Sequence, residues 1–106
     1  MLGNMKDMMG MMGKLKEAQK KVEETKTRLD NEILHQRTKD GKLEIKMSVS
    51  QKIQDITLSS ELMEDKEQLE DYLVLALNKI LERAKTQYEA ELADAAKDGM
   101  PKIPGM

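Results

Sequence analysis

The segment that most constrains the fold is residues 60–82, SELMEDKEQLEDYLVLALNKILE. It begins as an acidic helix and then becomes apolar on every side, through residues 73–77 and 80–81. A helix that is apolar all round is buried all round. A chain of 106 residues with two tyrosines and no Phe or Trp has few large side chains with which to cover it. We therefore expect a second copy of the chain to supply the cover, which predicts a homodimer.

The predicted dimer interface lies on the apolar turns of this helix. Its residues are Leu73, Val74, Leu77, Asn78, Ile80 and Leu81. Asn78 is the one uncharged polar residue within the apolar run, and a buried Asn can fix the register of a helical interface at some cost in stability. We prefer this structural role for Asn78 over contact with a ligand. At the helix start, Asp65 and Gln68 have the spacing of a capping box.

A second helix is predicted over residues 5–29, where the apolar residues follow a heptad. One seam position holds Met8, Leu15, Val22 and Leu29, and the other begins with Met5 and Met12. Three early glycines each disfavour helix by about 1 kcal/mol relative to Ala, so the first turns should fray unless they are packed.

Five methionines gather at the start of this helix, at positions 5, 8, 9, 11 and 12. We interpret them as a flexible apolar surface that packs on the dimer mate, since Met side chains adapt to irregular neighbours. Thioethers can also bind Cu(I), but no His or Cys accompanies the cluster, so copper is the weaker alternative.

Between the helices the apolar period changes from helical to alternating. Ile33 and His35 share one face of a predicted strand, and an Asp-Gly pair at residues 40–41 indicates a hairpin turn. Residues 43–49 then alternate apolar and polar, and residues 53–58 form a third strand. The predicted fold is therefore α+β: a helix, a three-stranded antiparallel meander and a long helix. We expect a single domain over residues 1–98 and a flexible tail over residues 99–106.

The sequence contains no pattern that indicates an enzyme. It has no cysteine, no Gly-rich phosphate loop, no metal-ligand spacing and no nucleophile motif. The one histidine, His35, lacks a supporting catalytic group and is interpreted as a surface or sheet-face residue. We expect no cofactor, no metal and no small-molecule substrate. No apolar run reaches about 18 residues, so we expect no membrane partner and a cytoplasmic location.

Positive charge is concentrated in the first helix, although the net charge of the chain is −2. Residues 1–29 carry seven Lys/Arg against four Asp/Glu. Lys14, Lys21 and Arg28 lie seven residues apart and line one edge over roughly 21 Å, with Lys20 alongside and Lys16 further round. Such a stripe suits a phosphate backbone. The alternative is a solvated face, on which Glu17–Lys21 and Glu24–Arg28 pairs partly neutralise the stripe.

Residues 41–85 carry a family resemblance. The segments GKLEIKMSV, IQDITLSSELMEDKEQLED and LVLALNKILERAK resemble the YbaB/EbfC family of bacterial nucleoid-associated proteins, and LSSELMEDKEQLED is the most specific of the matching elements. The resemblance implies a homodimer with joined sheets and protruding paired helices. It also implies binding to double-stranded DNA and an influence on nucleoid organisation and gene expression. On this basis the predicted DNA-binding residues are Lys14, Lys16, Lys20, Lys21 and Arg28, with weak or shape-based sequence preference.

The alternative from another class is a coiled-coil interaction protein that does not bind nucleic acid, such as a prefoldin-like chaperone subunit. Prefoldins also place a β-hairpin region between two coiled-coil helices. The short first helix and the mid-helix position of the apolar patch favour the compact dimer. Two departures from the family pattern, Ser48-Val49 and Gln54-Asp55, bear on DNA affinity and not on the fold.

Overall fold

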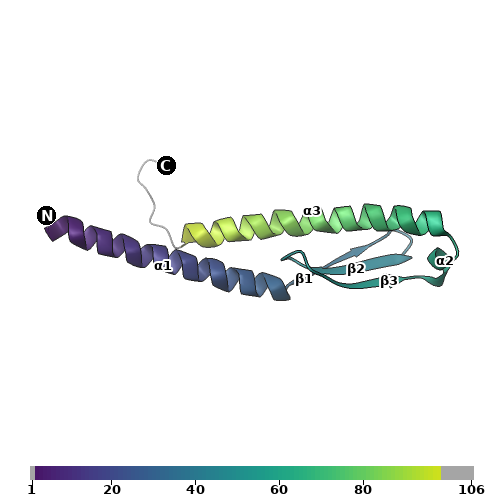
Figure 1. Ribbon diagram of the computed structural model, residues 1–106, viewed down its shortest axis with the longest axis horizontal. Helices are drawn as coiled ribbons and strands as arrows, with labels where there is room; N and C mark the ends of the chain where they lie inside the picture. Colours follow the sequence, from purple (N-terminus) through teal and green to yellow (C-terminus); the bar gives the residue numbers. More distant parts are fainter. Residues whose placement is uncertain (1, 99–106) are drawn as a thin grey trace. The chain divides into compact units, whose positions relative to one another are not determined.

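The computed structural model describes the backbone of residues 2–98 and the side chains of residues 8–98 (Figure 1). Its elements in chain order are α1 (Leu2–Asn31), β1 (Ile33–Arg37), β2 (Leu43–Ser48), β3 (Ile53–Leu58), α2 (Ser60–Met63) and α3 (Lys66–Asp98). This order confirms the predicted α+β fold. The chain divides into two compact units, residues 28–88 and the residues on either side. The predicted tail, residues 99–106, lies outside the described residues.

The sheet has the order β1-β2-β3, and both strand pairs are antiparallel, as the meander prediction requires. The alternating apolar residues of β2 are wholly buried: Leu43, Ile45 and Met47. Leu34 and Gln36 of β1 pair with Met47 and Ile45, so they share the core face of the sheet. His35 points to the other face, where its Nδ1 lies 3.3 Å from Glu44 Oε1, which confirms its interpretation as a sheet-face residue.

Each of the two hairpin turns contains one residue with a positive φ, but the residue type differs. In the β1–β2 turn, Gly41 adopts a φ of 74°, which glycine does without steric cost. The β2–β3 turn has no glycine, and Gln51 adopts a φ of 72° instead. The buried Ser48 holds this turn, because its Oγ accepts the Lys52 N–H at 3.1 Å and lies 2.8 Å from Ser50 Oγ. A side-chain hydroxyl thus keeps a non-glycine residue in the left-handed region.

The start of α3 forms half of the predicted capping box. Asp65 Oδ1 accepts the Gln68 N–H at 3.1 Å, as expected for an N-cap. The Gln68 side chain does not reach back, and its Nε2 instead donates to Tyr72 Oη at 3.3 Å. The reciprocal bond is unnecessary because the Asp65 N–H already donates to the Leu62 carbonyl at the end of α2, at 3.2 Å.

The hydrophobic core lies between the sheet and one face of α3. Its buried members are Leu43, Ile45, Met47, Leu62, Ala76, Ile80 and Ala84, with Leu73 and Leu77 partly buried against them. Ile80 has no exposed surface, whereas Val74 and Leu75 are 59% and 67% exposed in the single chain. The sheet therefore covers the face of α3 that carries Ile80, which the sequence analysis assigned to a second copy.

In the other unit, α1 is continuous from Leu2, so its glycines do not interrupt the helix. Met8, Met9, Met11 and Met12 are 58–71% exposed in the single chain, while Ala18 and Ala95 are buried. Along the predicted seam, Leu15 is exposed and Val22 is half-buried. Leu29, which belongs to the unit of residues 28–88, is wholly buried. Among the seam residues whose side chains are described, burial therefore increases towards the C-terminal end of α1. Packing of the methionines on a dimer mate stays a prediction.

Candidate nucleic-acid interface and a basic pocket

All five predicted DNA-binding residues are exposed on α1. Two of them have carboxylate neighbours: Arg28 Nη1 lies 2.9 Å from Glu32 Oε2, and Lys20 Nζ lies 4.0 Å from Glu24 Oε1. Arg28, one of the two cations expected to be neutralised, therefore has a carboxylate neighbour, and so does Lys20, for which none was expected. Exposed pairs of this kind contribute about 0–1 kcal/mol, so they compete weakly with a phosphate for the cation.

The other three lysines of the stripe, Lys14, Lys16 and Lys21, have no carboxylate within 4.0 Å among the side chains of residues 8–98. The expected Glu17–Lys21 pair is not formed. Three ammonium groups are therefore available to an anionic partner without first leaving an ion pair, which favours a phosphate-binding surface over a neutralised face.

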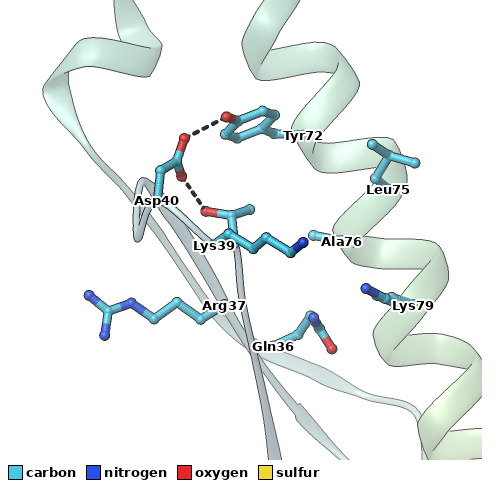
Figure 2. Close-up of a pocket in the computed structure, with 9 residues that line it drawn as sticks. Gln36, Arg37, Lys39, Asp40, Tyr72, Leu75, Ala76 and Lys79 are labelled. Carbon is cyan, nitrogen blue, oxygen red and sulfur yellow. Dashed lines mark hydrogen bonds between the residues drawn. The ribbon is translucent and has the colours of Figure 1, made fainter.

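A second group of cations surrounds a pocket between the β1–β2 turn and α3. The pocket has a volume of about 360 Å³ and is lined by Gln36, Arg37, Thr38, Lys39, Asp40, Tyr72, Leu75, Ala76 and Lys79. Figure 2 shows Lys39 and Lys79 extending toward each other across the pocket, whereas Arg37 points away from α3. The Arg37 guanidinium lies over Gly41, where a Cβ would be 2.8 Å from its Nη2.

The carboxylate in this pocket is held by the turn and by α3. Asp40 Oδ2 accepts the Tyr72 hydroxyl at 2.5 Å (Figure 2). Its Oδ1 accepts the Thr38 hydroxyl at 2.8 Å and the Lys42 N–H at 3.1 Å. These bonds, that from Tyr72 above all, lower the pKa of Asp40 from 3.8 to about 2. The same contact raises the pKa of Tyr72, because ionised Tyr72 would lose its proton donor and face a carboxylate.

Further along α3, polar bonds join the helix to β1 and to Glu32, the residue before that strand. Arg83 Nη1 donates to the His35 carbonyl at 2.7 Å and to Gln36 Oε1 at 2.9 Å. Gln87 Nε2 donates to Glu32 Oε1 at 3.1 Å. We call this side of the helix, from Tyr72 through Lys79 to Arg83, the β1 flank of α3.

The opposite side of α3 is apolar and open. Val74, Leu77 and Leu81 have the 3-4 spacing of one helical stripe, on the side away from the β1 flank. On the sheet, Ile56 pairs with Ile45 and Ile53 with Met47, so both isoleucines lie on the core face. They are nevertheless 39% and 50% exposed. We call these five residues the β3 flank.

The predicted dimer-interface residues are thus distributed over three environments. Ile80 lies in the core of its own chain, Leu73 and Leu77 are half-buried beside it, and Val74 and Leu81 are exposed on the β3 flank. Asn78 is exposed as well. Sequence reasoning did not find Ile53 and Ile56, although the core-face pairing of β3 with β2 was a usable signal.

The basic pocket was also missed by sequence reasoning. Leu75 and Lys79 have the i, i+4 spacing that places them on one side of a helix, but only the fold brings Lys39 next to them. The side chains of residues 8–98 include no group of three or more His, Asp or Glu arranged to hold a metal ion. Within residues 2–98, no helix has the length and apolar character needed to cross a bilayer.

Comparison with known proteins identifies the family. Residues 5–100 match the model of the YbaB/EbfC DNA-binding family. The chain belongs to this family. The match confirms the resemblance found in residues 41–85 and extends it over α1, which carries the exposed lysines.

Two similar proteins cover almost the whole chain. A nucleoid-associated protein of Flavobacterium johnsoniae is 51% identical over 100 residues, which are 94% of each chain. A nucleoid-associated protein of Agrobacterium fabrum is 30% identical and covers 96% of each chain. The crystal structure of an uncharacterized protein from Helicobacter pylori matches with a TM-score of 0.63, at 19% identity, over 68% of this chain and 86% of that chain, which supports the fold alone.

Proposed function

We propose that this protein is a nucleoid-associated protein that binds duplex DNA as a homodimer, through the cations of α1. Its membership of the YbaB/EbfC family and the names of its relatives support the proposal. The observation that carries it is the set of exposed lysines Lys14, Lys16 and Lys21, which have no carboxylate neighbour among the described side chains. Lys20 and Arg28 add two exposed cations to the same helix. We assign the protein no catalytic activity.

The contact with DNA is phosphate-based in this proposal. Lysine ammonium groups act as point charges toward phosphates and carry little information on base sequence. The preference among sequences therefore depends on the shape of the duplex more than on base edges. Both tyrosines lie on α3 and neither belongs to the sheet, so the sheet offers no aromatic platform on which single-stranded bases could stack.

We assign the homodimer contact to the β3 flank. β3 is an edge strand whose backbone has a partner on one side only, and soluble proteins protect such edges. Exposed apolar residues of the kind that mark protein interfaces lie on β3 itself, at Ile53 and Ile56, and on α3, at Val74 and Leu81. A second copy offers the same surface, and a two-fold axis pairs each patch with its own copy.

The DNA proposal is tested by titrating a fluorescent DNA duplex with protein at two salt concentrations. The triple variant K14Q/K16Q/K21Q should bind roughly tenfold more weakly at low salt, and its salt slope should fall by about 3, one for each lysine. The matched control K52Q/K66Q/K85Q removes the same charge outside α1 and should retain the parent slope. Equal loss in both triple variants would point to net charge alone and refute the assigned surface.

The dimer proposal is tested by measuring mass against concentration in sedimentation experiments. Val74→Asp should raise the dissociation constant by roughly tenfold or more, because association would bury a charge. The neighbouring Leu75→Asp is the matched control, since Leu75 is equally apolar and exposed but lies on the β1 flank. A parent protein that is monomeric at every concentration would refute the dimer, while the DNA titration would still stand.

A further inference from the structure

The pocket on the β1 flank has the composition of an anion-binding site. Its lining includes the cations Lys39 and Lys79 and the carboxylate Asp40, which give a formal charge of +1, while the guanidinium of a third lining cation, Arg37, points away from α3 (Figure 2). Lys39 and Lys79 have no carboxylate within 4.0 Å among the described side chains. Their ammonium groups extend into the space between the turn and α3 (Figure 2).

The one carboxylate does not satisfy these lysines. Both oxygens of Asp40 accept hydrogen bonds from Tyr72, Thr38 and the Lys42 backbone, which fixes the carboxylate at the turn. Lys42 itself is paired with Glu61, at 3.2 Å from Nζ to Oε2. Six N–H donors, three on each free ammonium group, are therefore available to a ligand on the open side of the pocket.

The amide of Gln36 adds a neutral donor to the same space. Its Oε1 accepts from Arg83 Nη1 at 2.9 Å, which orients the amide so that the Nε2 group is left to donate. Figure 2 shows this amide on the same side of β1 as the Lys39 and Lys79 ammonium groups. Two ammonium groups and one amide around a common space suit the several oxygens of a phosphoryl group.

The rest of the pocket wall is apolar. Two apolar residues of α3 line it: Ala76, which is 5% exposed, and Leu75, which is exposed. An inorganic anion makes no use of such a wall, whereas an organic ring or sugar would cover it. The volume of about 360 Å³ lies at the lower end of the range for small-molecule sites, and the concave shape does not fit the convex backbone of a duplex.

From these contacts we propose that the pocket between the β1–β2 turn and α3 binds a phosphorylated small molecule of mononucleotide size. Lys39, Lys79 and the Gln36 amide hold its phosphoryl group, and its organic part covers Leu75 and Ala76. The site lies within residues 28–88 and uses none of the five DNA-binding cations predicted on α1. It is therefore independent of the DNA-binding proposal.

The proposal is tested by calorimetry and amide NMR with the four ribonucleoside 5′-monophosphates, adenosine and inorganic phosphate as probes. At least one monophosphate should bind and shift the amide signals of residues 36–40 and 75–79. Adenosine and inorganic phosphate should each bind roughly tenfold more weakly, because each lacks one half of the contacts. Absence of binding by all four monophosphates at millimolar concentration would overturn the proposal.

Two variants then separate the pocket from the general charge of the protein. Lys39→Met with Lys79→Met keeps the length of both exposed side chains and should weaken monophosphate binding roughly tenfold or more. The control Lys66→Met with Lys85→Met removes the same charge elsewhere and should bind as the parent does. Equal affinity of the K39M/K79M protein and its parent would overturn the site, even if a monophosphate binds.

The duplex titration tests whether the pocket lysines bind the phosphates of DNA instead of those of a small molecule. The K39M/K79M protein should bind duplex DNA with the same salt slope as the parent. If it instead loses DNA affinity while no monophosphate binds to the parent, the pocket lysines belong to the DNA surface and the small-molecule proposal is wrong. A parent that binds monophosphate but not DNA would refute the DNA proposal alone.

Discussion

The two flanks of α3 are built from different interactions over the same stretch of helix. On the β1 flank, Tyr72 and Arg83 donate hydrogen bonds to the turn and to β1. On the β3 flank, Leu77 packs against the core while Val74 and Leu81 remain exposed. Hydrogen bonds are directional and hold the helix in one position, whereas apolar contact is not and can be completed by any matching surface.

In the proposed dimer, this difference lets one helix serve both folding and assembly. The polar bonds fix α3 over β1 and leave the far side of the sheet, at Ile53 and Ile56, without a helix above it. A more central position of α3 would cover those isoleucines and remove the surface that we assign to a partner. The position of α3 nearer β1 than β3 therefore leaves the apolar surface that the proposed dimer would bury.

The largest effect is expected from a substitution in the core beneath α3, between the two flanks. Ile80→Ala leaves a cavity beneath α3 and should lower the free energy of unfolding by about 2–5 kcal/mol. Urea unfolding, monitored by circular dichroism at one fixed protein concentration, measures it. Leu75→Ala, at a position that is 67% exposed and lies outside the β3 flank, is the control and should cost much less. Equal losses would mean that Ile80 is not a core residue.

The next substitution removes hydrogen bonds on the β1 flank and leaves the β3 flank unchanged. Arg83→Met keeps the apolar stem and removes the hydrogen bonds to the His35 carbonyl and to Gln36, so it should cost about 1–2 kcal/mol in urea unfolding. Dimer dissociation measured by sedimentation should be little affected. A variant that dissociates strongly but unfolds like the parent would reverse the assignment of roles to the two flanks.

A smaller effect should appear in the pH dependence of stability. Because folding lowers the pKa of Asp40, its contribution is complete above about pH 4 and is lost as the pH falls toward 2. The raised pKa of Tyr72 gives a contribution that is complete below pH 10 and is lost above it. Tyr72→Phe should therefore flatten the stability profile in both windows, as measured by thermal unfolding.

Tyr88→Phe is the matched control for this profile, because no hydrogen bond to its hydroxyl is found among the described residues. It should leave both windows as they are in the parent. If Tyr72→Phe and Tyr88→Phe give the same profile, the bond between Asp40 and Tyr72 does not contribute to stability in solution.

The smallest expected effect concerns the turn that places β3 at the open edge. Gln51→Gly should raise the free energy of unfolding by up to about 1 kcal/mol, because glycine adopts a φ of 72° without strain. Thr57→Gly places glycine at a position of β3 that is paired with Glu44, where it should destabilise the protein. Destabilisation by both changes would show that Gln51 has contacts that outweigh its backbone strain.

The local pattern was sufficient to predict the sheet and the helices. Alternation at Leu43, Ile45 and Met47 identified the central strand, and the Asp-Gly pair identified its preceding turn. The cap at Asp65 followed from spacing, while the bond of Gln68 to Tyr72 did not, because α2 had already satisfied the donor that Gln68 was expected to reach. Each successful prediction depended on neighbours close in sequence.

The features that were missed depend on contacts between distant segments. Apolar periodicity indicated that α3 is buried, but not which face meets the sheet, so Ile80 was assigned to a partner instead of the core. The pocket forms only because the fold brings Lys39 and Lys79, which are 40 residues apart in the sequence, to the same site. The lysines of α1 were found from their spacing, but the carboxylates that neighbour Lys20 and Arg28 depend on side-chain rotamers.

The exposed edge at β3 also has a consequence for the chain before it assembles. A strand with one unpaired edge and two exposed isoleucines can extend a sheet from chain to chain, which is how fibres begin. Asp55, the one charged residue of β3, would stack on its own copies in an in-register fibre and repel them. The charge of Asp55 thus opposes the open-ended extension of the sheet at this edge.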